Sequence, residues 1–333
     1  MLTTELLWNE DAFRQLEPVW DNLARGSMTD TPFQTWAYQK AWWRHLSPAD
    51  LMTISVRDES GEIVGIAPFF NKDGVLHFNG CVDETDYLDL ICRADVAEAV
   101  WTTVLDCLCN LEDIEWHALD LCNVPEASPT REILPQLAER WGFSFATEVQ
   151  EVCPVINLPN DFEDYLAELD KKQRHEIRRK MRRAQGAGAY LRVITAEDDI
   201  QTEVDRFLEL MQKSTFEKGA WLTEARAAVF HEVAAAALEA GTLQMLFFVV
   251  NDYPAAALFN FDYEGRIWVY NSGLDPEAFG HLSAGVVLSS WAIEKAVEDG
   301  RQVFDFLRGN ETYKYRFGAV DTTIHRIQIG RGS

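Results

Sequence analysis

The sequence lacks the short motifs that mark metal sites and redox-active thiol pairs. No CxxC pair occurs among its six cysteines and no HExxH motif among its seven histidines. We therefore predict no metal site. We expect the cysteines to be small buried side chains in a reducing compartment. They are Cys81, Cys92, Cys107, Cys109, Cys122 and Cys153.

Long apolar runs and a basic leader are also missing. No segment approaches about 18 uninterrupted apolar residues, the length needed to span a membrane. The first residues, Met1 to Glu5, carry an acid and no basic residue, unlike a secretory signal. We therefore expect a cytoplasmic protein without membrane insertion.

Positive charge is scarce. The chain has 30 Lys and Arg against 54 Asp and Glu, a formal net charge of −24. Such a surface repels nucleic acid and anionic lipid, so general binding to either is not expected. The segment 171–183 is the exception, with eight basic residues and one acid, Glu176.

The first half of the chain alternates strand and helix signals. An opening strand is expected near Leu6, and alternating apolar residues around a Gly-containing turn predict a hairpin at 52–70. The remaining predicted segments are helices at 11–25, 34–46 and 95–109, and strands at 75–79, 87–92 and 115–121.

The second half repeats this order after helices at 161–185, 200–216 and 223–240. Strands are predicted at 243–250, 255–263, 266–272 and 302–307, with a helix at 283–298 before the last. The matching order suggests duplication. We predict an α/β fold of two domains, 1–155 and 156–333, with mixed sheets covered by helices.

A loop of small residues leads into the helix at 283–298. A strand containing Tyr270 and Ser272 is followed by Leu282, Ser283, Ala284 and Gly285. A helix N-terminus presents unpaired N–H groups and a positive dipole end, which can hold phosphate. Ser283 is expected to cap the helix and Gly285 to let a ligand approach the backbone; a plain structural cap is the alternative.

The equivalent turn in the first half contains no glycine and has an acid, Asp95, at its entry. An acid in this position would itself interact with the helix dipole and would repel a pyrophosphate. Only the second half is therefore expected to bind a nucleotide.

A polar cluster follows the last predicted strand. Strand ends are where α/β sheets usually place binding groups. The alternative is a structural network in which Asp305 pairs with Arg308 or Arg316. The other polar members of the cluster are Glu311, Tyr313 and Lys314.

The string from Asp305 to Lys314, the Leu-Ser-Ala-Gly helix start and the segment 270–276 resemble the CelD-like acetyltransferases of the GNAT superfamily. The segments 32–43 and 65–68 and the basic helix fit the same family. The resemblance implies two tandem GNAT-like domains, as in Fem-type transferases, with the donor site in the C-terminal domain.

The activity implied by the resemblance is acyl transfer from acetyl-CoA or another acyl-CoA. The resemblance does not imply a particular acceptor. We expect an amine or hydroxyl on a small molecule or glycan, in polysaccharide or cell-envelope biosynthesis. In the Fem branch the donor is aminoacyl-tRNA. The donor site would include Tyr270, Ser272, Leu282, Ser283, Ala284 and Gly285.

Acyl transfer needs a base, a partner for the developing oxyanion and a proton donor for the leaving group. Glu311 or Asp305 could be the base, Lys314 or backbone N–H groups the oxyanion partner, and Tyr313 or Tyr270 the proton donor. Arg308 and Arg316 are candidates for binding substrate.

Three hypotheses follow: an acyl-CoA-dependent transferase, a Fem-type aminoacyl-tRNA-dependent transferase and a non-catalytic scaffold. Confinement of the positive charge to one helix argues against tRNA. That helix, within 161–185, is either a solvated structural element or a patch for the 3′-phosphate of coenzyme A, an anionic acceptor or the acceptor arm of tRNA.

Overall fold

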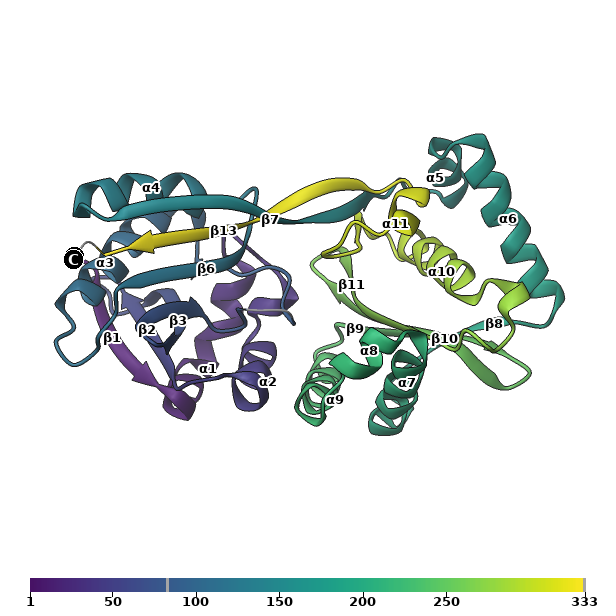
Figure 1. Cartoon of the computed structure of the whole chain (residues 1–333), viewed down its shortest axis with the longest axis horizontal. Coiled ribbons are helices and arrows are strands. Elements are labelled where there is room, and N and C mark those ends of the chain that lie inside the picture. The colour runs from purple at the N-terminus through teal and green to yellow at the C-terminus, as the bar shows by residue number, and fades with distance from the viewer. Residues whose placement is uncertain (82–83, 332–333) are drawn as a thin grey trace. The chain divides into compact units, whose positions relative to one another are not determined.

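The computed structural model describes residues 1–81 and 84–331 (Figure 1). The contacts within the chain divide it into two compact units. Unit 1 comprises Met1–Val152 together with the segment from Thr323 onward, and unit 2 comprises Cys153–Thr322.

Unit 1 is a mixed sheet with helices. The strand order is β1-β2-β3-β4-β6-β13-β7, with β5 pairing β3. The elements are β1 (Thr3–Trp8), α1 (Asn9–Arg25), η1 (Pro32–Gln34), α2 (Trp36–Leu46), β2 (Leu51–Arg57), β3 (Ile63–Lys72), β4 (Val75–Phe78), β5 (Ile91–Cys92), η2 (Ala94–Val96), α3 (Ala97–Asn110), β6 (Ala118–Pro125), α4 (Thr130–Trp141), most of β7 (Ser144–Asn157) and most of β13 (Val320–Gly330).

The core of unit 1 forms because α1 is amphipathic. Its apolar residues recur every three or four positions, so they share one face of the helix. This face packs on Leu51 of β2 and Ile66 of β3. The residues buried on it are Ala12, Phe13, Leu16, Trp20 and Ala24.

The parallel pairing of β4 with β6 is short, because it covers only Val75–Leu76 and Ala118–Leu119. Beyond it, the chain after β4 stays attached to β6. Asn123 Nδ2 donates to the Thr85 carbonyl oxygen at 2.7 Å, and a disulfide joins Cys81 to Cys122. The expectation of reduced cysteines is therefore wrong for this pair, whose separation of 41 residues gives no local signal.

Unit 2 has the strand order β7-β12-β11-β10-β9-β8. Helix α10 covers one face of the sheet, and α7, α8 and α9 lie on the other (Figure 1). The elements are α5 (Phe162–Glu168), α6 (Lys171–Gly186), β8 (Tyr190–Val193), α7 (Ile200–Ser214), α8 (Phe216–Trp221), α9 (Glu224–Glu239), β9 (Leu243–Val250), β10 (Tyr253–Tyr263), β11 (Arg266–Leu274), η3 (Gly280–Leu282), α10 (Ala284–Glu298), β12 (Val303–Asp305) and α11 (Thr312–Arg316).

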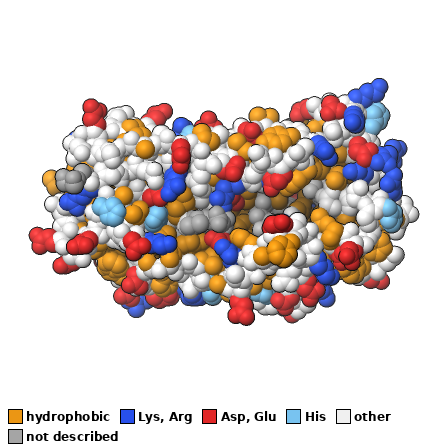
Figure 2. All heavy atoms as spheres, viewed as in Figure 1, with side chains coloured by type: hydrophobic (Ala, Val, Ile, Leu, Met, Phe, Trp, Pro, Cys, Tyr) orange, Lys and Arg blue, Asp and Glu red, His pale blue; other side chains and the backbone are white. Residues whose placement is uncertain are grey.

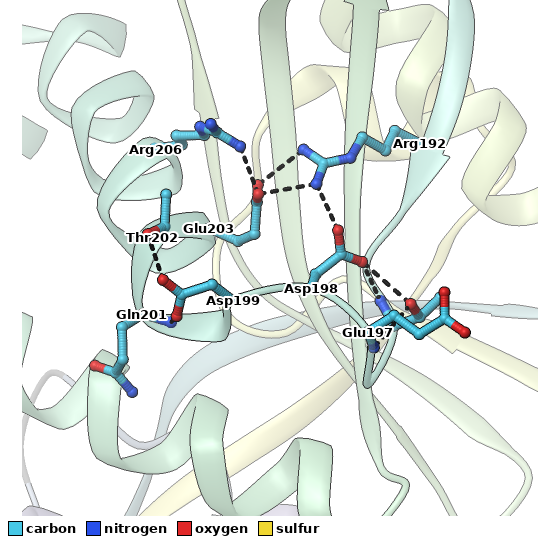
Figure 3. A network of polar contacts seen from close by, with 9 residues as sticks. Arg192, Glu197, Asp198, Asp199, Gln201, Thr202, Glu203 and Arg206 are labelled. Atoms are coloured by element: carbon cyan, nitrogen blue, oxygen red, sulfur yellow. Dashed lines mark hydrogen bonds and ion pairs between the residues drawn. The ribbon is translucent and has the colours of Figure 1, made fainter.

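A buried carboxylate fixes the turn from β8 into α7 (Figure 3). Glu203 accepts two hydrogen bonds from Arg192, at 2.9 and 2.8 Å, and Arg192 also donates to Asp198 at 2.7 Å. Arg206 approaches the same carboxylate at 2.5 Å. The Asp199 side chain caps α7 by accepting from the Gln201 N–H. The charge of Glu203 is therefore balanced inside the fold.

The predicted helix at 161–185 is wrong as a single element. Leu169 and Asp170 are extended, and the Asp170 carboxylate accepts from the N–H groups of Lys172 and Gln173, at 2.8 and 3.0 Å. This N-cap starts α6 as a new helix. The predicted strand at 87–92 is confirmed at its end alone, where Ile91–Cys92 pairs with β3; residues 87–90 are not in a strand.

The last strand departs from the predicted division at residues 155 and 156. The segment from Ile324 to Gly330 pairs antiparallel with β6, so it belongs to unit 1 although the sequence placed 156–333 in the C-terminal domain. The cause is a pairing across about 200 residues, which local sequence patterns do not reveal.

Candidate functional site

Two neighbouring parallel strands of unit 2 separate after a short pairing. β11 and β12 pair only through Arg266–Trp268 and Val303–Asp305, whereas β11 continues to Leu274. The remainder of β11 therefore has no partner on that side from β12. The ends of parallel strands at such a gap are where α/β sheets bind ligands.

A cavity of about 240 Å³ lies at this separation. One wall comes from β10 and β11, including Ser272, and another from the first turns of α10, including Gly285. The rest is apolar or aromatic, with Phe306 and Tyr313 from the chain after β12. Such a lining suits an elongated apolar group with a few polar atoms.

The predicted donor residues divide between the cavity and the core. Ser272 and Gly285 line the cavity, whereas Leu282 and Ala284 are buried in the hydrophobic core. The expected cap by Ser283 is wrong, since the residue has a φ of +56° and makes no side-chain cap hydrogen bond. In this conformation its hydroxyl does not cap α10.

Tyr270 marks a bulge in β11. Phe259 pairs with Asn271 and Asn260 with Val269, so Tyr270 is an extra residue in the ladder. The centroid of its ring lies 5.3–5.6 Å from the centroids of three phenylalanine rings. Those rings are Phe230, Phe259 and Phe261. Tyr270 therefore contributes to packing and to the bulge, and it is not among the residues lining the cavity.

Lys218, which the sequence prediction missed, binds the same stretch of β11. Its Nζ donates to the carbonyl oxygen of Ser272 at 2.6 Å, to Asn271 Oδ1 at 3.0 Å and to Ser272 Oγ at 3.2 Å. Burial lowers the pKa of Lys218 to about 8, an effect that Glu311 opposes and Lys314 increases. Sequence offers little signal for it, because Lys218 lies on a six-residue helix far from the C-terminal string.

Lys314 holds the loop after β12. Its Nζ donates to the carbonyl oxygens of Leu307, Arg308 and Gly309 at 3.2, 2.6 and 3.0 Å. It also pairs with Glu311 Oε2 at 2.9 Å. Lys314 is buried while Glu311 is exposed. An ammonium has three protons to donate, and here they bind the carbonyl groups of the loop. Lys314 therefore fixes the loop.

Asp305 is fully buried at the end of β12. One oxygen accepts from the Leu307 N–H at 2.8 Å, and the other lies 3.5 Å from Arg266 Nη1. Arg266 lies outside the string that the sequence analysis selected. The carboxylate stabilises Leu307, whose φ is +57°, a conformation unusual for a non-glycine residue.

Tyr313 lines the 240 Å³ cavity and also a second cavity of about 420 Å³. Desolvation, with a smaller contribution from Glu311, raises the pKa of its phenol. The hydroxyl is therefore protonated at neutral pH. Arg316 lines the second cavity, whereas Arg308 is half-buried and contributes its carbonyl to Lys314.

Among residues 1–81 and 84–331, no three His, Cys, Asp or Glu side chains gather so as to hold a metal ion. Within the same ranges, every helix is too short or too polar to cross a membrane.

Comparison with known proteins agrees with this geometry. Residues 171–315 match the model of a family described as the acetyltransferase (GNAT) domain. The match includes Lys218, Lys314 and every residue that lines the 240 Å³ cavity except Phe317. A search of curated proteins finds none that matches the sequence.

Several solved structures share the fold. FemX superposes with a TM-score of 0.68 at 11% identity, covering 92% of this chain and 94% of FemX. The C-terminal domain of a protein assigned as a lysylphosphatidylglycerol synthetase from Agrobacterium fabrum gives 0.57 at 10% identity, over 88% and 87%. A tandem GNAT protein from the clavulanic acid biosynthesis pathway gives 0.50 at 12% identity, over 99% and 100%. The chain thus has a tandem GNAT-like α/β fold, as predicted.

Proposed function

We propose that the protein is an acyltransferase that moves an acetyl or longer acyl group from acyl-CoA to an amine or hydroxyl acceptor. The observation that carries this proposal is the cavity where β11 and β12 separate. Its apolar walls suit the arm and acyl group of a thioester, and its few polar atoms come from residues such as Ser272 and Tyr313.

The cavity also supports an assignment of roles. Tyr313 would protonate the leaving thiolate, because it lines the cavity and a phenol carries its proton at neutral pH. The Lys218 ammonium can only donate hydrogen bonds, so Ser272 Oγ accepts one from it. The hydroxyl proton of Ser272 is therefore available to donate to a ligand oxygen. Glu311 is exposed, acts electrostatically on Lys218 and would serve as base for the acceptor.

Two of the proposed catalytic residues take different roles in this scheme. Lys314 and Asp305 would position the loop that carries Glu311 and Tyr313, because their polar atoms already bind the loop backbone. Backbone N–H groups at the start of α10 would then stabilise the oxyanion, with Gly285 giving the thioester access to that helix end.

Donor binding is proposed for unit 2 alone. In unit 1 the chain after β4 bonds to β6 where the equivalent strands of unit 2 separate. Asp95 at the start of the equivalent helix region pairs with Arg93, with Nη2 and Oδ2 2.8 Å apart. In full, we propose a cytoplasmic, CelD-like transferase that acts on a small-molecule or glycan acceptor.

Aminoacyl-tRNA is the second candidate donor. The similarity to FemX and to a protein assigned as a lysylphosphatidylglycerol synthetase favours it, as does the basic helix α6 beside the cavity. Both donors present an activated acyl carbon on a carrier that contains phosphate.

Titration calorimetry with acetyl-CoA and longer acyl-CoAs tests the proposal. We expect one saturable site in the wild type, loss of binding in Gly285→Leu, and retention in Gly285→Ala. An alanine Cβ at 285 would lie 3.6 Å from Leu274 Cδ2, an ordinary van der Waals contact, whereas a leucine would extend into the cavity.

Failure of the wild type to bind any thioester would overturn the acyl-CoA proposal. Binding of an aminoacylated tRNA minihelix would then identify the second donor. Absence of both would leave the scaffold hypothesis, under which Lys314→Ala changes only local stability.

A further inference from the structure

A groove beside the cavity has an unusual charge for this chain. It has a volume of about 420 Å³ and lies between one face of α6, the first turn of α10 and α11. Lys172, Lys180 and Arg316 line it. Figure 2 shows Lys and Arg side chains gathered over α6, although the whole chain has a net charge of −24.

The cations of this groove are incompletely balanced. Among the described residues, Lys172 and Arg316 have no ion-pair partner. Lys180 lies 3.5 Å from Glu176, the acid of the lining. Glu176, however, already binds Arg179 through two hydrogen bonds of 2.9 and 2.7 Å, which lower the pKa of its carboxyl. The groove therefore retains net positive charge.

The groove adjoins the proposed acyl cavity. Val286, Tyr313 and Phe317 line both. A molecule whose apolar arm occupies the cavity would therefore place its other end in or beside the groove. A charged group at that end would have to be an anion to gain from Lys172 and Arg316.

Helix α6 is held against the loop that enters α10. Arg183 Nη1 donates to the carbonyl oxygen of His281 at 3.0 Å. That loop, residues 281–285, contains no lysine or arginine. The positive charge missing from the loop sequence is thus supplied in space by a helix about 100 residues earlier.

We propose that this groove binds the phosphate groups of the acyl donor, with Lys172, Lys180 and Arg316 as the recognising side chains. The inference rests on the proposed acyltransferase function. It adds a location for the charged end of the carrier, which is the groove. The phosphates belong either to coenzyme A or to the acceptor end of a tRNA. In both, an activated acyl group is joined to a phosphate-bearing carrier.

The experiment compares ligands that differ in phosphate content across charge-reversal variants. The ligands are coenzyme A, 3′-dephospho-coenzyme A, pantetheine and an aminoacylated tRNA minihelix. The variants are Lys172→Glu and Arg316→Glu, with Arg316→Gln as a milder change. Arg182→Glu is the matched control, because Arg182 is exposed on α6, donates to the Arg178 carbonyl oxygen at 3.3 Å and does not line the groove.

We expect each groove variant to lose about tenfold or more in affinity for coenzyme A, the effect of one charge-assisted hydrogen bond. Pantetheine affinity should stay unchanged in every variant, as should coenzyme A affinity in Arg182→Glu. Unchanged pantetheine binding also shows that the variants are folded. The loss in the groove variants should shrink at high salt.

Equal losses in Arg182→Glu and the groove variants would overturn the inference, since they would reflect general charge. So would a wild type that binds coenzyme A and pantetheine equally well. If the wild type binds neither coenzyme A nor pantetheine, the proposed acyl-CoA function is wrong. Binding of the minihelix then tests the groove. Minihelix binding that Lys172→Glu weakens and Arg182→Glu does not supports the groove; absence of such binding overturns it.

Discussion

Lys218 Nζ lies 2.6 Å from the carbonyl oxygen of Ser272 and 3.2 Å from its hydroxyl oxygen. A lysine of α8 thereby holds the part of β11 that lines the cavity. Because the ammonium is largely removed from water, its proton is bound less tightly than in the unfolded chain.

The stability of the protein should therefore depend on pH through Lys218. Burial lowers the pKa of Lys218 to about 8 from 10.5, so above pH 8 the unfolded state holds a proton that the folded state has lost. Relative to Lys218→Met, the wild type should gain stability as pH rises from about 8 to 10.5, by up to about 3 kcal/mol.

Chemical denaturation of both proteins across this pH range measures the effect. Lys218→Arg is the control, since arginine keeps its charge throughout. A difference between wild type and Lys218→Met that stays flat, or that falls with pH, would contradict the lowered pKa. Direct titration of the isotopically methylated lysine by NMR gives an independent value.

Replacing Lys314 should lower the free energy of unfolding, because Lys314 holds the loop after β12. Lys314→Met leaves three loop carbonyl groups, those of Leu307, Arg308 and Gly309, without this partner. We expect a loss of about 3–5 kcal/mol in the free energy of unfolding. Denaturant titration measures it. Full stability with complete loss of activity would instead favour Lys314 as an oxyanion partner.

Two glycines on the cavity walls should respond in opposite ways to alanine. In Gly273→Ala the new Cβ would lie 2.5 Å from the Met211 nitrogen and 2.8 Å from the Leu210 carbonyl carbon, which are backbone atoms of α7. A loss of about 1–3 kcal/mol or more is expected. Gly285→Ala has room within α10 and should gain up to about 1 kcal/mol. Thermal unfolding of both variants compares them, and similar effects would show that α7 does not approach β11 closely.

Asp305 should act on the loop conformation. Asp305→Ala removes the acceptor for the Leu307 N–H and the partner of Arg266, with an expected cost of about 1–3 kcal/mol. Asp305→Asn keeps the acceptor and should lose less. Once a transfer assay exists, the pH profile of kcat should be the same in Asp305→Asn as in the wild type. A profile that loses its acidic limb in Asp305→Asn would identify Asp305 as the base.

Local pattern predicted the fold well where one element contains its own signal. The hairpins, the helix at 284–298 and the order of elements follow from apolar periodicity and turn residues. The sequence also located the string from Asp305 to Lys314 beside the cavity. It could not distinguish a lysine that donates to backbone carbonyls from one directed at substrate, because both have the same residue types at the same spacing.

What the sequence could not predict depends on contacts between distant segments. Lys218 meets β11 across more than 50 residues, and α6 reaches the loop before α10 across 98 residues. Within α6, the break at Asp170 arises from competition between a capping carboxylate and continued helix, a choice that periodicity alone does not decide.

The pairing of β13 with β6 has a consequence for biosynthesis. β6 ends at Pro125, yet the strand that pairs with it, Ile324 to Gly330, is synthesised about 200 residues later, after all of unit 2. Most of unit 1 is thus made before unit 2 and is completed after it. Until then an edge of its sheet offers unpaired N–H and C=O groups to any other chain. Nascent unit 1 should therefore be the form of this protein most dependent on chaperones.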